Sequence, residues 1–71
     1  MLTPESIGKF YKDHNANEYI CINYIEPCCS KPYFLLKEFD GYSIYPYNAK
    51  GQRLDHKLQV VLDSTLNLTE G

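Results

Sequence analysis

The feature that most constrains the fold is a run of alternating side chains at residues 18–26, EYICINYIE. A period of two divides this run into two faces: Ile20, Ile22 and Tyr24 on one, and Tyr19, Cys21 and Ile25 on the other. Both faces are apolar and rich in β-branched and aromatic residues, which is typical of a strand that is covered on both sides. The run therefore predicts a central strand, with a helix over one face and tyrosines on the other.

Two further strands follow the first. Residues 27–32, PCCSKP, carry two prolines, which exclude a regular ladder and predict a loop. Residues 33–39 and 42–47 flank the dipeptide Asp40-Gly41, a strong signal for a hairpin. Pro46 places the last of these strands at an edge, since proline cannot donate to a ladder. The pattern predicts an antiparallel meander of three strands.

A helix is predicted at the start of the chain. Thr3 suits an N-cap and Pro4 suits the first helical position. Three apolar residues at helical spacing follow: Ile7, Phe10 and Tyr11. The polar segment at residues 13–17 would end this helix.

The last third of the chain supports two interpretations. Six residues share one helical face behind Asp55, a candidate N-cap: Leu54, Leu58, Val61, Leu62, Thr65 and Leu66. A strand is the alternative, with Leu58, Val60 and Leu62 alternating. We favour the helix. The predicted fold is then α+β, a single domain over residues 1–71 in the order α-β-β-β-α, with both helices on one face of the sheet.

Charge and cysteine content set expectations about partners and compartment. Seven basic residues against nine acidic ones give a net charge of -2, which disfavours a nucleic-acid binder. No stretch resembles a signal peptide or a membrane span, so we expect no membrane contact. Three cysteines do not make a closed disulfide framework, which favours free thiols and a cytoplasmic location.

Catalytic, metal and cofactor motifs are absent from the sequence. Cys28 and Cys29 are adjacent, whereas zinc ligands usually come in pairs separated by two to four residues, and His14 and His56 stand alone. The serines lack a nucleophile elbow, and no glycine-rich phosphate loop is present. We expect no enzyme activity, no metal and no cofactor. A thiol or zinc function of Cys28 and Cys29 stays a minor alternative.

One basic cluster offers a different function. Lys50, Arg53 and Lys57 lie close together in the sequence. The predicted order of elements is similar to that of double-stranded-RNA-binding domains, in topology only. That family carries a lysine-rich start to its last helix, where this chain has residues 53–57, RLDHK. A nucleic-acid-binding module using these three residues is therefore the alternative hypothesis.

Tyrosines supply the leading hypothesis. The chain has seven tyrosines and no tryptophan, and Tyr19, Tyr33, Tyr45 and Tyr47 fall on predicted strands. Tyrosine is enriched at the centres of protein interfaces. We expect a small protein-protein interaction domain, an inhibitor or adaptor that covers a partner protein, with a homodimer as another outcome. Phage proteins that block host enzymes have this size and character, which is an analogy only.

Overall fold

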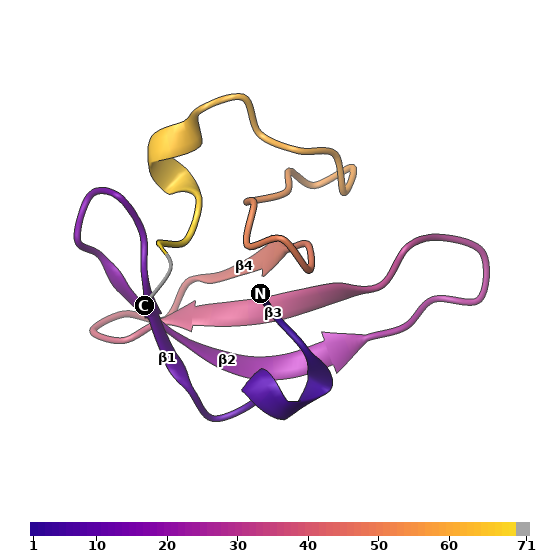
Figure 1. Cartoon of the computed structure of the whole chain (residues 1–71), viewed down its shortest axis with the longest axis horizontal. Helices are drawn as coiled ribbons and strands as arrows, with labels where there is room; N and C mark the ends of the chain where they lie inside the picture. The colour runs from indigo at the N-terminus through magenta and orange to yellow at the C-terminus, as the bar shows by residue number, and fades with distance from the viewer. Residues whose placement is uncertain (70–71) are drawn as a thin grey trace.

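The computed structural model describes residues 1–69 and contains one antiparallel sheet of four strands in the order β1-β2-β3-β4 (Figure 1). Its elements are η1 (Pro4–Ser6), β1 (Phe10–Lys12), β2 (Glu18–Ile25), β3 (Tyr33–Glu38), β4 (Ile44–Tyr47) and η2 (Ser64–Leu66), where η denotes a 3-10 helix. The three predicted strands are present as β2, β3 and β4. The predicted α+β fold is wrong, because neither terminal helix is present in the described part of the chain.

The N-terminal helix is replaced by a single 3-10 turn and a strand. Pro4 does open η1, and the Ser6 hydroxyl accepts a hydrogen bond from the Thr3 amide at 3.1 Å. Gly8 then adopts a φ of +90°, which an α-helix cannot accommodate. The amide of Gly8 instead donates to the Cys21 carbonyl at 2.7 Å, and Phe10 begins β1 beside β2. Pairing with β2 therefore outweighs the helical spacing of this segment.

The prediction of a C-terminal helix is also wrong, and so is the alternative prediction of a strand in the same segment. Between Leu54 and Asp63 the only strand-like pairing is the isolated bridge that joins Leu54 to Val60. The 3-10 helix η2 that follows covers three residues. Asp55 explains why no helix starts here. Its carboxylate accepts hydrogen bonds from the amides of Lys57 and Gln59, which closes a turn rather than opening a helix.

This turn occurs three times within residues 1–69, starting at Asp13, Asn48 and Asp55. In each, the side chain of the first residue accepts from the amides of the third and fifth residues. The first and fifth residues also share a backbone hydrogen bond of 2.9–3.1 Å. The fourth residue has positive φ: Ala16, Gly51 and Leu58. Short polar side chains thus set the path of the chain at these three points, and at Asp55 the turn stands where a helix was expected.

A bulge in β2 changes which side chains share a face. The pairing with β3 shifts between Cys21 and Asn23, so that Tyr24 faces Phe34 while Cys21 faces Leu36. The extra residue, Ile22, reverses the alternation beyond it. Tyr24 therefore lies on the same face as Tyr19 and Cys21, contrary to the prediction from strict alternation.

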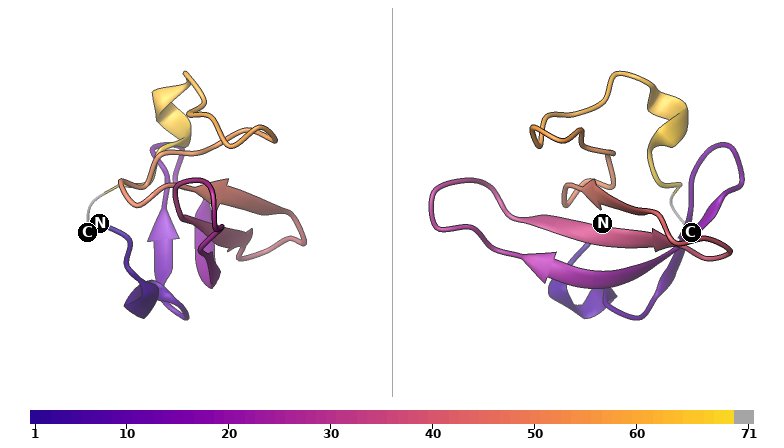
Figure 2. Two further views of the ribbon diagram at one scale, coloured as in Figure 1. Left: turned by 90° about the vertical axis from the view of Figure 1, so that its right-hand side faces the viewer. Right: turned by 180° about the vertical axis from the view of Figure 1, so that it is seen from behind.

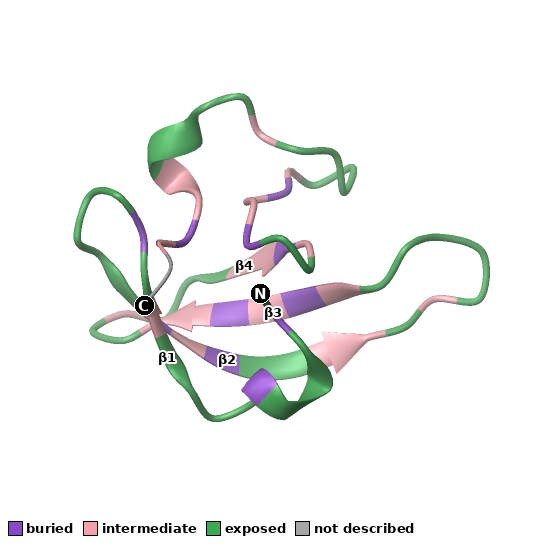
Figure 3. Ribbon diagram, viewed as in Figure 1, coloured by how far each residue is buried: buried purple, intermediate pink, exposed green. Residues whose placement is uncertain are grey.

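The core lies on one face of the sheet, here called the inner face. Its buried members are Leu2, Tyr19, Cys21, Phe34, Leu36, Tyr47 and Leu68. Leu2 and Leu68 come from the two ends of the chain, and the Leu2 amide donates to the Ala49 carbonyl at 2.9 Å. Buried positions form a stripe along the strands, while most of residues 55–65 is exposed (Figure 3). Seen from behind, no other segment crosses in front of β2 and β3 (Figure 2).

Candidate functional site

Three of the four predicted binding tyrosines lie together on the inner face. The Tyr19 ring meets Tyr45 edge-on at 6.2 Å between centroids and Tyr47 at 6.0 Å. Their common face follows from the register, since Tyr45 pairs with Leu36 and Tyr47 with Phe34. Tyr33 starts β3 opposite Ile25 and lies on the other face. The sequence therefore predicted the grouping of three rings, but not of the fourth.

Arg53 fills the space between these rings. Its Nη2 atom donates to the hydroxyls of Tyr19 and Tyr47, each at 2.8 Å, and its Nε donates to Tyr47 at 3.1 Å. The guanidinium carbon lies 3.9 Å from the centroid of the Tyr45 ring. Tyr19 in turn donates its hydroxyl proton to Asp13 Oδ2 at 3.1 Å. We call these five residues the Arg53 cluster.

Burial sets the ionisation of the Arg53 cluster. Burial raises the pKa of Tyr47 far above its usual range and also raises the pKa of Tyr19, where the charge of Arg53 offsets part of the effect. Burial opposes the charge of Arg53, but hydrogen bonds to the two phenols outweigh it and raise the pKa of the guanidinium. The phenols are therefore neutral at physiological pH and serve as hydrogen-bond partners for one half-buried cation.

The Arg53 cluster is a structural centre and offers no accessible binding surface. Tyr47 has no exposed area and Tyr19 is 3% exposed, so neither ring reaches a partner. Tyr45 is half-buried beneath Arg53, and its hydroxyl donates to Glu38 Oε1 at 3.0 Å. The tyrosine surface expected from the sequence thus points into the molecule, because residues 48–69 fold over it.

The opposite face of the sheet is apolar and uncovered. Pairing across all four strands aligns Phe10, Ile20, Lys37 and Ile44 in one row. The next row places Leu35 beside Pro46, and the Phe39 ring meets the Phe10 ring edge-on at 5.6 Å. We call this surface the open face: Phe10, Ile20, Leu35, Lys37, Phe39, Ile44 and Pro46. Phe10, Phe39 and Ile44 are 56%, 53% and 48% exposed.

Lys37 is the charged residue in the middle of the open face. Its ammonium group donates to the carbonyl of Glu38 at 3.0 Å and lies 5.9 Å from the Tyr42 ring centroid. The side chain is half-buried among apolar neighbours, in the row between Ile20 and Ile44. A carboxylate that approaches this face would find a cation held in a fixed position.

Sequence reasoning missed the open face for an identifiable reason. The spacing of Phe10 fits a helical face, and Phe39 and Ile44 lack the tyrosine hydroxyl that pointed to the inner-face cluster. The alternation within residues 33–47 indicates a second apolar face. Along the strand, Lys37 and Phe39 point to the face opposite to that of Leu36 and Glu38. A search for apolar residues on both faces of each strand would have found this surface.

The three basic residues predicted as a cluster, Lys50, Arg53 and Lys57, do not form one site in the structure. Arg53 belongs to the buried cluster, whereas Lys50 and Lys57 line two adjoining hollows of about 390 and 540 Å³. Both hollows also contain Lys31 and Pro32, and the larger one contains Tyr33. Among the residues that the structure describes, no acidic side chain lines either hollow. We call the two together the lysine hollow.

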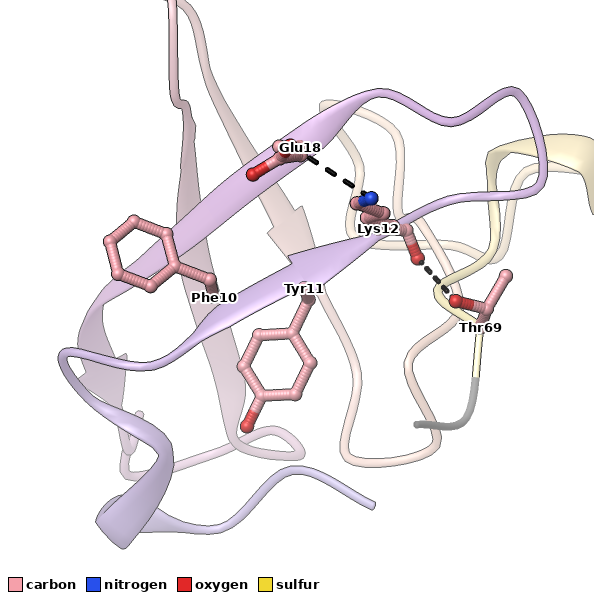
Figure 4. A pocket seen from close by; sticks show the side chains of 5 residues that line it. All are labelled: Phe10, Tyr11, Lys12, Glu18 and Thr69. Carbon is pink, nitrogen blue, oxygen red and sulfur yellow. Dashed lines mark hydrogen bonds and ion pairs between the residues drawn. The ribbon is translucent and has the colours of Figure 1, made fainter.

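A third hollow, of about 390 Å³, lies at the end of β1 (Figure 4). Its charges are already matched, because Lys12 Nζ is 4.0 Å from Glu18 Oε1. The hydroxyl of Thr69 donates to the Lys12 carbonyl at 3.1 Å. Phe10 and Tyr11 extend to opposite sides of the strand (Figure 4). The two opposite charges of this hollow thus lie within reach of each other, and it does not present one sign of charge to a ligand.

The thiols and imidazoles do not make a metal site. Among residues 1–69, no three His, Cys, Asp or Glu side chains gather as metal ligands would. Cys21 is buried in the core, where burial raises the pKa of its thiol, while Cys28 and Cys29 are exposed in the β2–β3 loop. No helix within the described residues has the length and apolar character to cross a bilayer.

Comparison of the chain with protein-family models, with curated proteins and with solved structures gives no match.

Proposed function

We propose that this chain is a small, non-enzymatic protein-binding domain that docks a partner protein on its open face and acts in the cytoplasm as an inhibitor or adaptor. The observation that carries the proposal is the row Phe10–Ile20–Lys37–Ile44, which runs across the whole sheet with two of its apolar side chains about half exposed. Contiguous exposed apolar surface rimmed by polar groups is typical of interaction sites.

The charge of Lys37 selects the kind of partner. A second copy stacked over the centre of this face would bring two ammonium groups together, and opposed like charges are unfavourable. A different protein can place a carboxylate there, between apolar side chains that cover Phe39 and Ile44. The proposed occupant is therefore a partner with an apolar surface that carries one acidic residue at its centre.

Capture with matched variants tests this proposal. The wild-type chain, Lys37→Glu, the double variant Phe39→Ser/Ile44→Ser and the control Leu62→Ser would each be immobilised and exposed to lysate of the source cells. Leu62 is 97% exposed, so its loss removes apolar area without touching the open face. We expect a protein retained by the wild type and the control to bind at least tenfold less to the other two, about 1.4 kcal/mol.

Circular dichroism must show that all four proteins are equally folded. Equal retention by wild type and open-face variants would contradict the proposal. Retention of nothing but the chain itself, with a monomer–dimer equilibrium that Lys37→Glu strengthens or leaves unchanged, would contradict the choice of partner.

The lysine hollow supports a second candidate function, binding of single-stranded nucleic acid. Lys31, Lys50 and Lys57 supply three cations, none of the acidic residues among residues 1–69 lines the lysine hollow, and Tyr33 is a lining residue of its larger part. Basic grooves with an aromatic side chain bind single strands through phosphate contacts and base stacking. Compared with the sequence-based hypothesis, Lys31 replaces Arg53.

Fluorescence anisotropy with a labelled oligouridylate would test this candidate. Three phosphate contacts predict a slope of about −2 for the logarithm of affinity against the logarithm of salt concentration. Lys31→Glu and Lys57→Glu should each lower affinity severalfold, whereas Lys9→Glu, which lies outside the lysine hollow, should have a much smaller effect. No binding at low salt, or equal effects of all three variants, would dismiss it.

A further inference from the structure

The two exposed thiols of this chain are close neighbours in space as well as in sequence. Cys28 and Cys29 form a turn in the loop between β2 and β3, which projects from one end of the sheet (Figure 1). Their sulfur atoms lie 3.1 Å apart, and both residues are exposed. Pro27 and Pro32 flank the pair and restrict the loop backbone on either side. An oxidant in solution can therefore reach two thiols that already face each other.

We propose that Cys28 and Cys29 are a redox-sensitive vicinal dithiol, which closes reversibly to an intraloop disulfide by exchange with a low-molecular-weight disulfide of the glutathione type. This inference is independent of the protein-binding and nucleic-acid-binding proposals.

The exchange balances in two steps. One cysteine, as the thiolate, attacks a sulfur of the small disulfide, forms a mixed disulfide and expels one small thiolate. The neighbouring cysteine then attacks the protein sulfur of the mixed disulfide, which forms the Cys28–Cys29 bond and expels the second thiolate. The two protons lost by the protein end on the two released thiols, so the protein loses two protons and two electrons, which together are two hydrogen atoms. The small disulfide is reduced.

Chain geometry makes this bond a reversible modification and not a permanent crosslink. Adjacent Cα atoms across a trans peptide are about 3.8 Å apart, below the separation of about 4.4 Å at which most disulfides begin. The ring is therefore strained, and strained, exposed disulfides are the easily reduced ones. Closure would also stiffen the turn just before Ser30, Lys31 and Pro32, which line the larger part of the lysine hollow.

The third cysteine provides an internal control. Cys21 is fully buried on the inner face, where no oxidant reaches it in the folded chain. Its sulfur contacts the carbonyl of Asn23 within its own strand at 4.0 Å. A reaction of the folded protein should therefore distinguish Cys21 from the loop pair.

The test uses the full, reduced chain incubated with oxidised glutathione, then denatured, alkylated and analysed by mass spectrometry. We expect a monomer lighter by two hydrogen atoms, with Cys21 alkylated, Cys28 and Cys29 unmodified, and full reversal by dithiothreitol. Cys21→Ser should behave like the wild type. Cys28→Ser and Cys29→Ser should instead stop at the glutathione adduct.

Two results would overturn the proposal. One is a wild-type chain that stays as a stable glutathione adduct at Cys28 or Cys29 without ring closure. The other is a crosslinked dimer as the main product of the wild type at low protein concentration. Either would show that the two sulfurs do not meet in solution.

Discussion

Arg53 shows how much of the inner face depends on a single side chain. Its planar guanidinium bonds two phenol hydroxyls and lies against a third ring, a geometry that the point charge of lysine does not reproduce. Since Tyr19 also donates to Asp13, the cation and the carboxylate are connected through a phenol. Removal of Arg53 would leave the hydroxyl of Tyr47 buried without the partner that it has in the folded chain.

Substitution of Arg53 should therefore be costly. We expect Arg53→Met to lower the free energy of unfolding by about 2–4 kcal/mol, because it strands buried polar groups while keeping much of the side-chain volume. Arg53→Lys should lower the free energy of unfolding by less than Arg53→Met does, but should remain less stable than the wild type. Denaturant unfolding measures both against Lys50→Met, an exposed position where we expect less than about 0.5 kcal/mol. Equal losses for Arg53→Met and Lys50→Met would show that the Arg53 cluster contributes little.

At the scale of elements, three five-residue turns direct the chain between and after the strands, and the one at Asp55 takes the place of a predicted helix. Each begins with Asp or Asn and places its fourth residue at positive φ, at 65° for Ala16, 82° for Gly51 and 62° for Leu58. Only the second of these turns uses glycine, and it is the one buried against both ends of the chain: the Leu68 amide donates to the Gly51 carbonyl at 2.8 Å. At Gly51 a backbone conformation that favours glycine therefore coincides with close packing against both ends of the chain.

Alanine substitution can separate these two effects. A Cβ atom at Gly51 would press on the Met1 side chain and lie 3.3 Å from Leu68 Cβ, whereas one at Gly8, with a φ of +90°, would meet nothing. We expect Gly8→Ala to cost about 1 kcal/mol for the backbone alone, and Gly51→Ala to cost about 1–2 kcal/mol more. Thermal or denaturant unfolding measures both. The packing argument fails if the two variants lose the same stability.

At the scale of the whole molecule, one sheet carries one covered face and one uncovered face. Residues from both ends of the chain close the inner side, where the largest buried side chains are Tyr47, Phe34 and Leu36. The open face has no such cover. A domain of this size buries a smaller share of its surface than a larger domain does, so stability and interaction compete for the same apolar residues. The arrangement places most of the buried core on one side of the sheet and leaves apolar side chains exposed on the other.

Buried phenols should make this stability sensitive to alkaline pH. The folded pKa values of Tyr19 and Tyr47 are raised above 10.0, so their contribution is complete below pH 10 and is lost as the pH rises beyond it, where the unfolded chain releases protons that the folded chain keeps. We expect the free energy of unfolding to fall by about 1.4 kcal/mol per pH unit for each phenol above pH 10.

Denaturant unfolding at several alkaline pH values, followed by tyrosinate absorbance, measures this slope. Tyr47→Phe should reduce the slope, while Tyr42→Phe, at a position 95% exposed, should leave it unchanged. A slope that is the same in all three proteins would contradict this account.

The meander β2–β3–β4 could be predicted because its signals are local. Alternation marks the strands, and Asp40-Gly41 marks the connection between β3 and β4. The first strand could not, since Phe10 and Tyr11 fit a helical face as well as a strand, and β2 decides between them. The C-terminal segment failed for a related reason. Its apolar residues have helical spacing, but the Asp55 side chain closes a turn.

Period-two alternation and proline act within a few residues, so the sequence alone sufficed to locate three strands, to place Tyr45 and Tyr47 on one face and to identify residues 27–32 as a loop. Which face became the core was decided by long-range packing. That choice depends on where Arg53 and Leu68 dock, more than thirty residues along the chain from Tyr19. Contacts so distant in sequence leave no periodic pattern, so the tyrosines turned inward and Phe10, Phe39 and Ile44 were left exposed.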